Sequence, residues 1–128
     1  MSAITGVMPV APTIFADNEE LDLDGQRRVL DYLVDGKSDA VCILANYSEQ
    51  FSLTDGEREQ VLRTTMEHLD GRLPVCVTTS HFSSRIARER SLRAQEPRGG
   101  NGHAHAAVLR GHHEGGRRGR GGVLQARG

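Results

Sequence analysis

Val41-Cys-Ile-Leu-Ala45 is a short, uninterrupted apolar run, and Thr54-Asp-Gly-Glu57 follows it after a polar loop. A run without polar alternation is typical of a strand that is covered on both faces, as in a parallel sheet. The Thr-x-x-Glu pattern is a capping box, in which each side chain accepts a hydrogen bond from a free backbone N–H at a helix start. Together the two segments predict a buried parallel strand followed by a helix.

Two similar apolar runs flank this one, Gly6-Val-Met-Pro-Val-Ala11 before it and Pro74-Val-Cys-Val-Thr78 after it. The three units begin near residues 5, 39 and 74, so their spacings are 34 and 35 residues. Such a period suits strand–helix–strand repeats with right-handed crossovers, and it also suits solenoid arrays. The spacing leaves both open, whereas the apolar strand runs favour an α/β fold.

Helix signals lie between and after the apolar runs. Asp24 is the expected cap of a first helix, Thr54 of a second and Ser83 of a third, and Gly71 is expected to close the second. The apolar stripes expected to face the core are Val29, Leu30, Leu33 and Val34, then Val61, Leu62, Thr65, Met66 and Leu69, and finally Ile86, Ala87 and Ala94.

Composition divides the 128 residues near Pro97. Residues 1–96 hold 16 acidic and 10 basic side chains, whereas residues 97–128 hold six arginines, one acid and ten of the 15 glycines. The chain has no apolar stretch long enough for a membrane helix and no basic-then-apolar leader, so a cytoplasmic protein is expected. Cys42 and Cys76 each lie inside an apolar run and are interpreted as buried hydrophobic residues, not as a disulfide or a metal site.

The loop Leu44-Ala-Asn-Tyr-Ser-Glu-Gln-Phe51, followed by Ser52-Leu-Thr-Asp-Gly-Glu-Arg58, resembles the dihydrodipicolinate synthase/N-acetylneuraminate lyase superfamily. That family has a Gly-Thr-Thr-Gly-Glu loop after its second strand and then a Leu-Thr/Ser-x-x-Glu helix start. Taken together with Thr78-Thr-Ser-His-Phe-Ser-Ser84, this sequence is most similar to the L-2-keto-3-deoxyarabonate dehydratase-like branch of the family. The resemblance implies that residues 1–96 are the first three βα units of an incomplete (β/α)8 TIM barrel, a fold that needs about 250 residues when complete.

The resemblance also implies a chemistry. In the family a lysine at the end of the sixth strand forms a Schiff base with a 2-keto acid, and the iminium then permits aldol cleavage or loss of water. A tyrosine near the fifth strand relays protons. The expected function is therefore that of a Schiff-base-forming lyase fragment whose substrate is a 2-keto-3-deoxy sugar acid or a related 2-keto acid. No cofactor or metal is expected, and intact relatives are expected to be homo-oligomers.

Three residues carry over as substrate-binding candidates. Asn46 and Tyr47 stand at the family's Thr-Thr pair, Ser48 stands at the following glycine, and Glu49 matches the glutamate. An amide, a phenol and a hydroxyl can still donate hydrogen bonds to a carboxylate or a sugar-acid hydroxyl. The departure from the family's Thr-Thr pair argues against the dihydrodipicolinate synthase reaction and favours a sugar acid as the substrate. The alternative is that Tyr47 and Phe51 pack against the second helix while Asn46 turns the backbone.

The catalytic lysine has no candidate. Lys37 is the only lysine, and it lies in the connection that precedes the second strand, at the structural end of a barrel. Its neighbours in the sequence are polar, so nothing there is expected to desolvate it. The resemblance implies a common glycine here, so Lys37 is expected in a left-handed backbone conformation. His81, just after the third strand, is interpreted as a loop-packing residue.

Residues 97–128 show no helical or strand period and permit two interpretations. One is a disordered Gly/Arg-rich tail that binds nucleic acid, which would make the chain a small binding protein; the absence of interleaved aromatic residues disfavours it. The other is an out-of-frame tail. Codons can be chosen for this stretch such that a reading frame shifted by one base near Pro97 encodes a strand ending in Pro-Pro-Tyr-Tyr. Such a strand resembles the family's continuation after its third helix.

The two interpretations predict different nucleotide sequences downstream of the codon for Glu96. If the tail is out of frame, sequencing the genomic locus will reveal a barrel continuation in the shifted frame. A gene that remains in frame, with no such continuation in either other frame, would refute the frameshift hypothesis.

Overall fold

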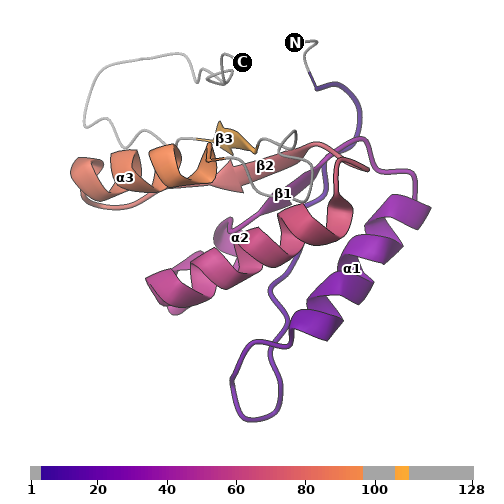
Figure 1. Ribbon diagram of the computed structural model, residues 1–128, viewed down its shortest axis with the longest axis horizontal. Helices are drawn as coiled ribbons and strands as arrows, with labels where there is room; N and C mark the ends of the chain where they lie inside the picture. The colour runs from indigo at the N-terminus through magenta and orange to yellow at the C-terminus, as the bar shows by residue number, and fades with distance from the viewer. Residues whose placement is uncertain (1–3, 97–105, 110–128) are drawn as a thin grey trace.

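The computed structural model describes residues 4–96 and 106–109 of the chain (Figure 1). Helices and strands alternate along it, as the sequence predicts. The elements are α1 (Leu23–Asp35), β1 (Val41–Ile43), α2 (Asp55–Leu69), β2 (Val75–Thr78), α3 (Ser84–Ala94) and β3 (Ala107–Leu109), with two short 3-10 turns after β1.

The three strands form one parallel sheet in the order β1-β2-β3. Val41 pairs with Val75 in the first ladder, and Val77 pairs with Val108 in the second. Because the spatial order follows the chain order, the sheet has no point at which the strand order reverses, unlike a doubly wound sheet. This arrangement is that of consecutive units of a barrel, in agreement with the predicted α/β class.

The predicted first strand, 6–11, forms only an isolated parallel bridge between Val10 and Cys42. Three backbone hydrogen bonds nevertheless join it to residues 39–42: Asp39 N donates to Val7 O at 2.9 Å, Cys42 N to Pro9 O at 2.9 Å, and Ala11 N to Cys42 O at 2.8 Å. Pro9 lacks the N–H that a regular ladder would use. The segment therefore lies where the first strand was expected but is not a regular strand.

The hydrophobic core lies between the sheet and the helices. Alternate strand residues Val41, Ile43, Val75, Val77 and Val108 belong to it, together with Leu30, Val61, Leu62, Met66, Leu69 and Ala94 of the helices. Because all three helices contribute to one core with strand residues of the same parity, they cover the same face of the sheet (Figure 1). The predicted stripe of α2 is buried in full.

Two of the three helices have the N-terminal cap that the sequence predicts, and the third does not. Thr54 and Glu57 form both bonds of the capping box, at 3.1 and 2.9 Å, and Ser83 caps α3. The cap of α1 is Asp22 and not Asp24, because the Asp22 carboxylate accepts from Gly25 N at 2.8 Å. The left-handed turn that ends α2 begins at Asp70 (φ 43°), one residue before Gly71 (φ 82°).

The expectation of no regular structure after residue 96 is wrong at one place, because Ala107–Leu109 pairs with β2 as β3. The remainder of the Gly/Arg-rich tail, residues 97–105 and 110–128, lies outside the described residues, as does the nucleic-acid-binding interpretation that depends on it. Among the described residues, no helix has the length and apolar character that crossing a membrane requires.

The cysteine prediction is confirmed. Cys42 and Cys76 are free thiols, both are 3% exposed, and they face each other across the β1–β2 ladder. Burial raises the pKa of each thiol, which keeps both protonated at neutral pH. They pack as small hydrophobic residues on the face of the sheet turned away from the helices.

Replacing Thr54 tests the capping box. In Thr54→Ala the Glu57 N–H loses its side-chain acceptor, and the free energy of unfolding should fall by about 1 kcal/mol. Urea unfolding followed by circular dichroism measures this change. Thr54→Ser keeps the acceptor and should stay close to the parent; equal losses in the two variants would contradict the capping role.

Candidate functional site

The loop that leaves β1 is built from two 3-10 turns, Asn46–Ser48 and Gln50–Ser52. Glu49 joins them in the left-handed region (φ 56°), and the buried Leu44 enters the loop with the same φ. A leucine in this conformation costs about 1–2 kcal/mol. Such strain is retained where surrounding contacts fix the backbone, and it clusters at functional sites.

Ser48 fastens this loop to the N-terminal segment. The serine is 1% exposed; its hydroxyl donates to Ala11 O at 2.6 Å, and its own carbonyl accepts from Thr13 Oγ1 at 2.7 Å. Ala11 ends the predicted first strand and Thr13 follows it, as Ser48 follows β1. The two chain segments are thereby fixed side by side at the carboxyl end of the sheet.

Asn46 and Tyr47 are exposed at that same end. Gln50 Nε2 donates to Asn46 Oδ1 at 2.7 Å, which leaves the Asn46 amide N–H groups free to act as donors. The Tyr47 side chain is 83% exposed and Phe51 is 60% exposed, so the alternative in which both pack against α2 is wrong. The three predicted substrate-binding residues lie in one turn, two on the surface and Ser48 beneath them.

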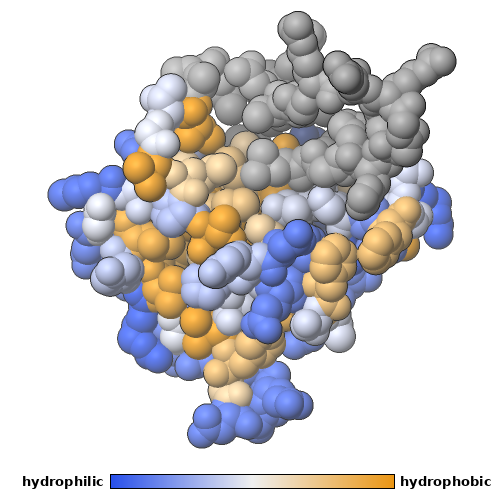
Figure 2. Space-filling view, turned by 180° about the vertical axis from the view of Figure 1, so that it is seen from behind, coloured by the Kyte–Doolittle hydropathy of each residue, from blue (hydrophilic) through white to orange (hydrophobic). Residues whose placement is uncertain are grey.

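Aromatic side chains from two loops meet beside this turn. The rings of Phe51 and Phe82 stack with centroids 5.8 Å apart, and Phe82 is 89% exposed. His81 Nδ1 accepts from Ser83 N at 2.9 Å and lies edge-on to Phe82. His81 therefore has the loop-packing role that its sequence position indicates. Figure 2 shows that apolar residues also reach the surface among charged ones on the face opposite to that of Figure 1.

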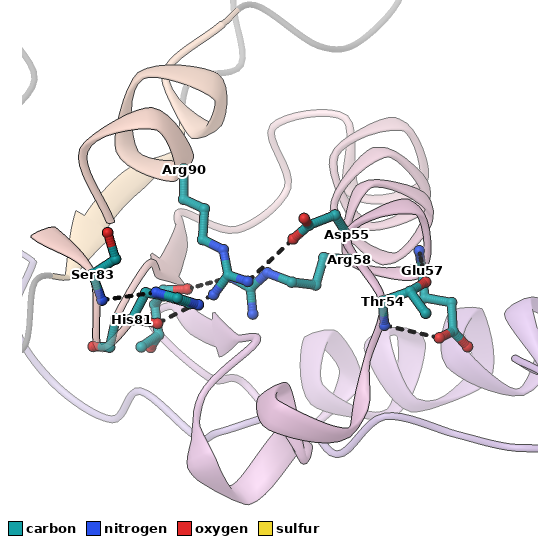
Figure 3. A network of polar contacts seen from close by, with 9 residues as sticks. Thr54, Asp55, Glu57, Arg58, His81, Ser83 and Arg90 are labelled. Atoms are coloured by element: carbon teal, nitrogen blue, oxygen red, sulfur yellow. Dashed lines mark hydrogen bonds and ion pairs between the residues drawn. The ribbon is translucent and has the colours of Figure 1, made fainter. Parts of the chain in front are cut away.

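Sequence inspection missed a pair of arginines between α2 and α3 (Figure 3). Arg58 is 6% exposed and donates through Nη2 to Thr78 O at 3.0 Å. Arg90 donates to Asp55 Oδ1 at 3.1 Å and to Ser80 O at 3.2 Å. Burial, followed by the charge of Arg90, lowers the pKa of Arg58 to about 10, against the opposing effect of Asp55. Arg58 precedes the core residues Val61 and Leu62 by three and four positions, which could have indicated its inward direction.

Lys37 is exposed and lies in the turn before β1, so it occupies the opposite end of that strand from the Asn46–Ser48 turn. Its φ of 61° confirms the expected left-handed conformation. No cluster of three or more His, Cys, Asp or Glu side chains suited to a metal ion occurs within residues 4–96 and 106–109.

The sequence profile of the dihydrodipicolinate synthetase family matches residues 3–102. The chain belongs to this family. It is 56% identical over 91 residues to L-2-keto-3-deoxyarabonate dehydratase of Azospirillum brasilense, a match that covers 71% of this chain and 29% of that protein. It is 30% identical over 96 residues to 4-hydroxy-tetrahydrodipicolinate synthase of Staphylococcus carnosus, covering 75% and 33%. This member of the family thus spans about a third of the length of the curated relatives it matches.

Among solved structures, the chain is similar to YagE of Escherichia coli K12, a prophage protein of the dihydrodipicolinic acid synthase family that was crystallised with pyruvate. The TM-score is 0.74 at 28% identity, and the match covers 85% of this chain and 35% of YagE. The family resemblance and the partial-barrel fold predicted from the sequence are confirmed.

Two substitutions in the turn test whether Ser48 stabilises the fold while Tyr47 does not. Ser48→Ala removes the donor to the Ala11 carbonyl, so the free energy of unfolding should fall by about 1–3 kcal/mol. Tyr47→Phe changes an exposed hydroxyl and should stay within about 0.5 kcal/mol of the parent. Urea unfolding measures both, and a larger loss in Tyr47→Phe than in Ser48→Ala would contradict this division.

Proposed function

We propose that the chain contributes the substrate-carboxylate turn of a Schiff-base-forming lyase that acts on a 2-keto-3-deoxy sugar acid. The observation that carries the proposal is the Asn46–Ser48 turn at the carboxyl end of β1, in a family member 56% identical to a 2-keto-3-deoxyarabonate dehydratase. Barrel enzymes build their active sites at this end of their strands. The Asn46 amide and the Tyr47 hydroxyl supply exposed donors of the kind that a carboxylate or sugar hydroxyl accepts.

Dehydration is favoured over aldol cleavage by the degree of similarity. The match to the dehydratase is 56% identical, whereas the match to E. coli YagE, which is named a putative 2-dehydro-3-deoxy-D-gluconate aldolase, is 32% identical over a similar length. In either reaction the lysine amine attacks the keto carbon and water leaves. The resulting iminium withdraws electrons from the adjacent carbon. In aldol cleavage, the bond from that carbon to the next one breaks. In dehydration, the adjacent carbon loses a proton, and the enamine so formed expels hydroxide from the next carbon, so that a second water is lost.

Schiff-base formation requires a lysine beside the substrate, and this chain has none there. Its one lysine, Lys37, stands at the far end of β1 from Asn46, is exposed, and has no desolvating surroundings. We therefore propose that the chain by itself is inactive and that the reactive lysine is encoded downstream, beyond a frameshift near Pro97. The intact enzyme is proposed to be cytoplasmic and homo-oligomeric, with a small 2-keto acid as its ligand.

Reductive trapping tests the proposal. Pyruvate with borohydride should leave the mass of this chain unchanged, because an exposed lysine has no bound keto acid to capture. A frame-restored protein should gain one reduced pyruvyl adduct on a lysine of the restored segment. Lys37→Arg in the restored protein is the matched control and should trap equally well.

Adduct formation at Lys37, or a restored protein that traps nothing, would refute the assignment. If the restored protein traps pyruvate, substitution of Asn46 by Ala should raise the KM for the sugar acid more than it lowers kcat, because a carboxylate contact binds substrate and transition state alike.

A further inference from the structure

A cleft of about 520 Å³ lies between α2 and α3, away from the Asn46–Ser48 turn. Its floor includes Val77 and Thr79 of the β2 region, and its walls include Arg58 of α2 and Arg90 of α3. Val77 belongs to the core between sheet and helices, so the cleft opens on the helix-covered face of the sheet. Both arginines are bonded at the carboxyl end of β2, to Thr78 O and Ser80 O, but no residue of the Asn46–Ser48 turn lines the cleft.

Both arginines leave a donor unused in this cleft. Arg58 Nη1 and Arg90 Nε are buried nitrogen atoms without a hydrogen-bond partner, although Arg58 Nη2 and both terminal nitrogens of Arg90 are bonded. Leaving a buried donor of a charged group unpaired is unfavourable, because the group loses its hydration without gaining a protein partner. Figure 3 shows the two side chains reaching toward each other from the two helices. Two unsatisfied and buried N–H groups therefore belong to residues that line the same cleft.

The carboxylate bonded to the arginine pair is that of Asp55. Asp55 is hydrogen-bonded to Arg90, and its side chain is 80% exposed, so most of its charge is solvated. The other acids that line the cleft, Glu59 and Glu89, form ion pairs with the exposed Arg63 and Arg85. Arg58 is left 6% exposed beside a second guanidinium, and both its burial and that neighbour lower its pKa. Such a group is stabilised by an anion that accepts from both arginines.

We propose that the α2–α3 cleft binds a small oxyanion, which accepts hydrogen bonds from Arg58 Nη1 and Arg90 Nε. A planar guanidinium presents its N–H groups in the geometry that carboxylate and phosphate oxygens accept. The ligand class is therefore a phosphate or a carboxylate of small size. This site is separate from the proposed substrate turn and does not depend on the lyase reaction.

The test is a titration of the full 15N-labelled chain with inorganic phosphate, and separately with acetate, each against sodium chloride at the same ionic strength. The readout is the Arg90 Nε–H resonance. We expect a saturable shift with at least one of the two anions, which also identifies whether the site takes phosphate or carboxylate. Absence of a saturable shift beyond the chloride reference with either anion would overturn the proposal.

Variants distinguish an anion bound by these two arginines from an anion attracted by the general positive charge of the helices. Arg58→Gln and Arg90→Gln should each weaken binding about tenfold, the effect of losing one charged hydrogen bond. Arg88→Gln removes the same charge from an exposed position of α3 that does not line the cleft, and it should bind as the parent does. Equal weakening in all three variants would overturn the proposal.

Folding is monitored by far-ultraviolet circular dichroism in every case. Should Arg58→Gln fail to fold, Arg90→Gln decides, because its side chain stands at the more open wall of the cleft (18% exposed). A folded Arg90→Gln protein that binds with the parent affinity, measured on backbone amide resonances of α2 and α3, would refute the site.

Discussion

The parallel pairing of β1 with β2 is the constraint on which the other features of this structure depend. With Val41 opposite Val75 and Ile43 opposite Val77, alternate residues of both strands turn toward the helices and form the core. Cys42 and Cys76 are consequently directed to the other face. The same register brings the ends of the two strands level, so that the loops leaving them emerge side by side. A shift by one residue would exchange the two faces.

How much of this could be predicted depended on the range of the interactions involved. The capping box of Thr54 and Glu57 is local, and the sequence was sufficient to locate it. Asp22 and Asp24 are two residues apart and chemically identical, so the sequence offered little to distinguish the true cap of α1. The first strand was located correctly but not its irregularity, which arises from the missing N–H of Pro9 within a ladder to another segment.

The candidate site shows the same limit. The family resemblance located Asn46, Tyr47 and Ser48 in one turn, yet only the fold distinguishes the buried serine from its two exposed neighbours. The arginine cleft was not predicted because its chemistry arises between helices. Arg58 has a position facing the core within α2, but its unpaired nitrogen and its repulsion from Arg90 exist only once α3 has packed on the sheet.

The two hydrogen bonds around Ser48 have a kinetic consequence. They join residues 35 and 37 positions apart, and both depend on a single serine. Closing so long a segment carries a loop-closure entropy cost that local turns avoid. The turn after β1 therefore cannot reach its final geometry until the N-terminal segment has docked beside β1. Its maturation during folding is governed by the arrival of Ala11 and Thr13 and not by the turn's own sequence.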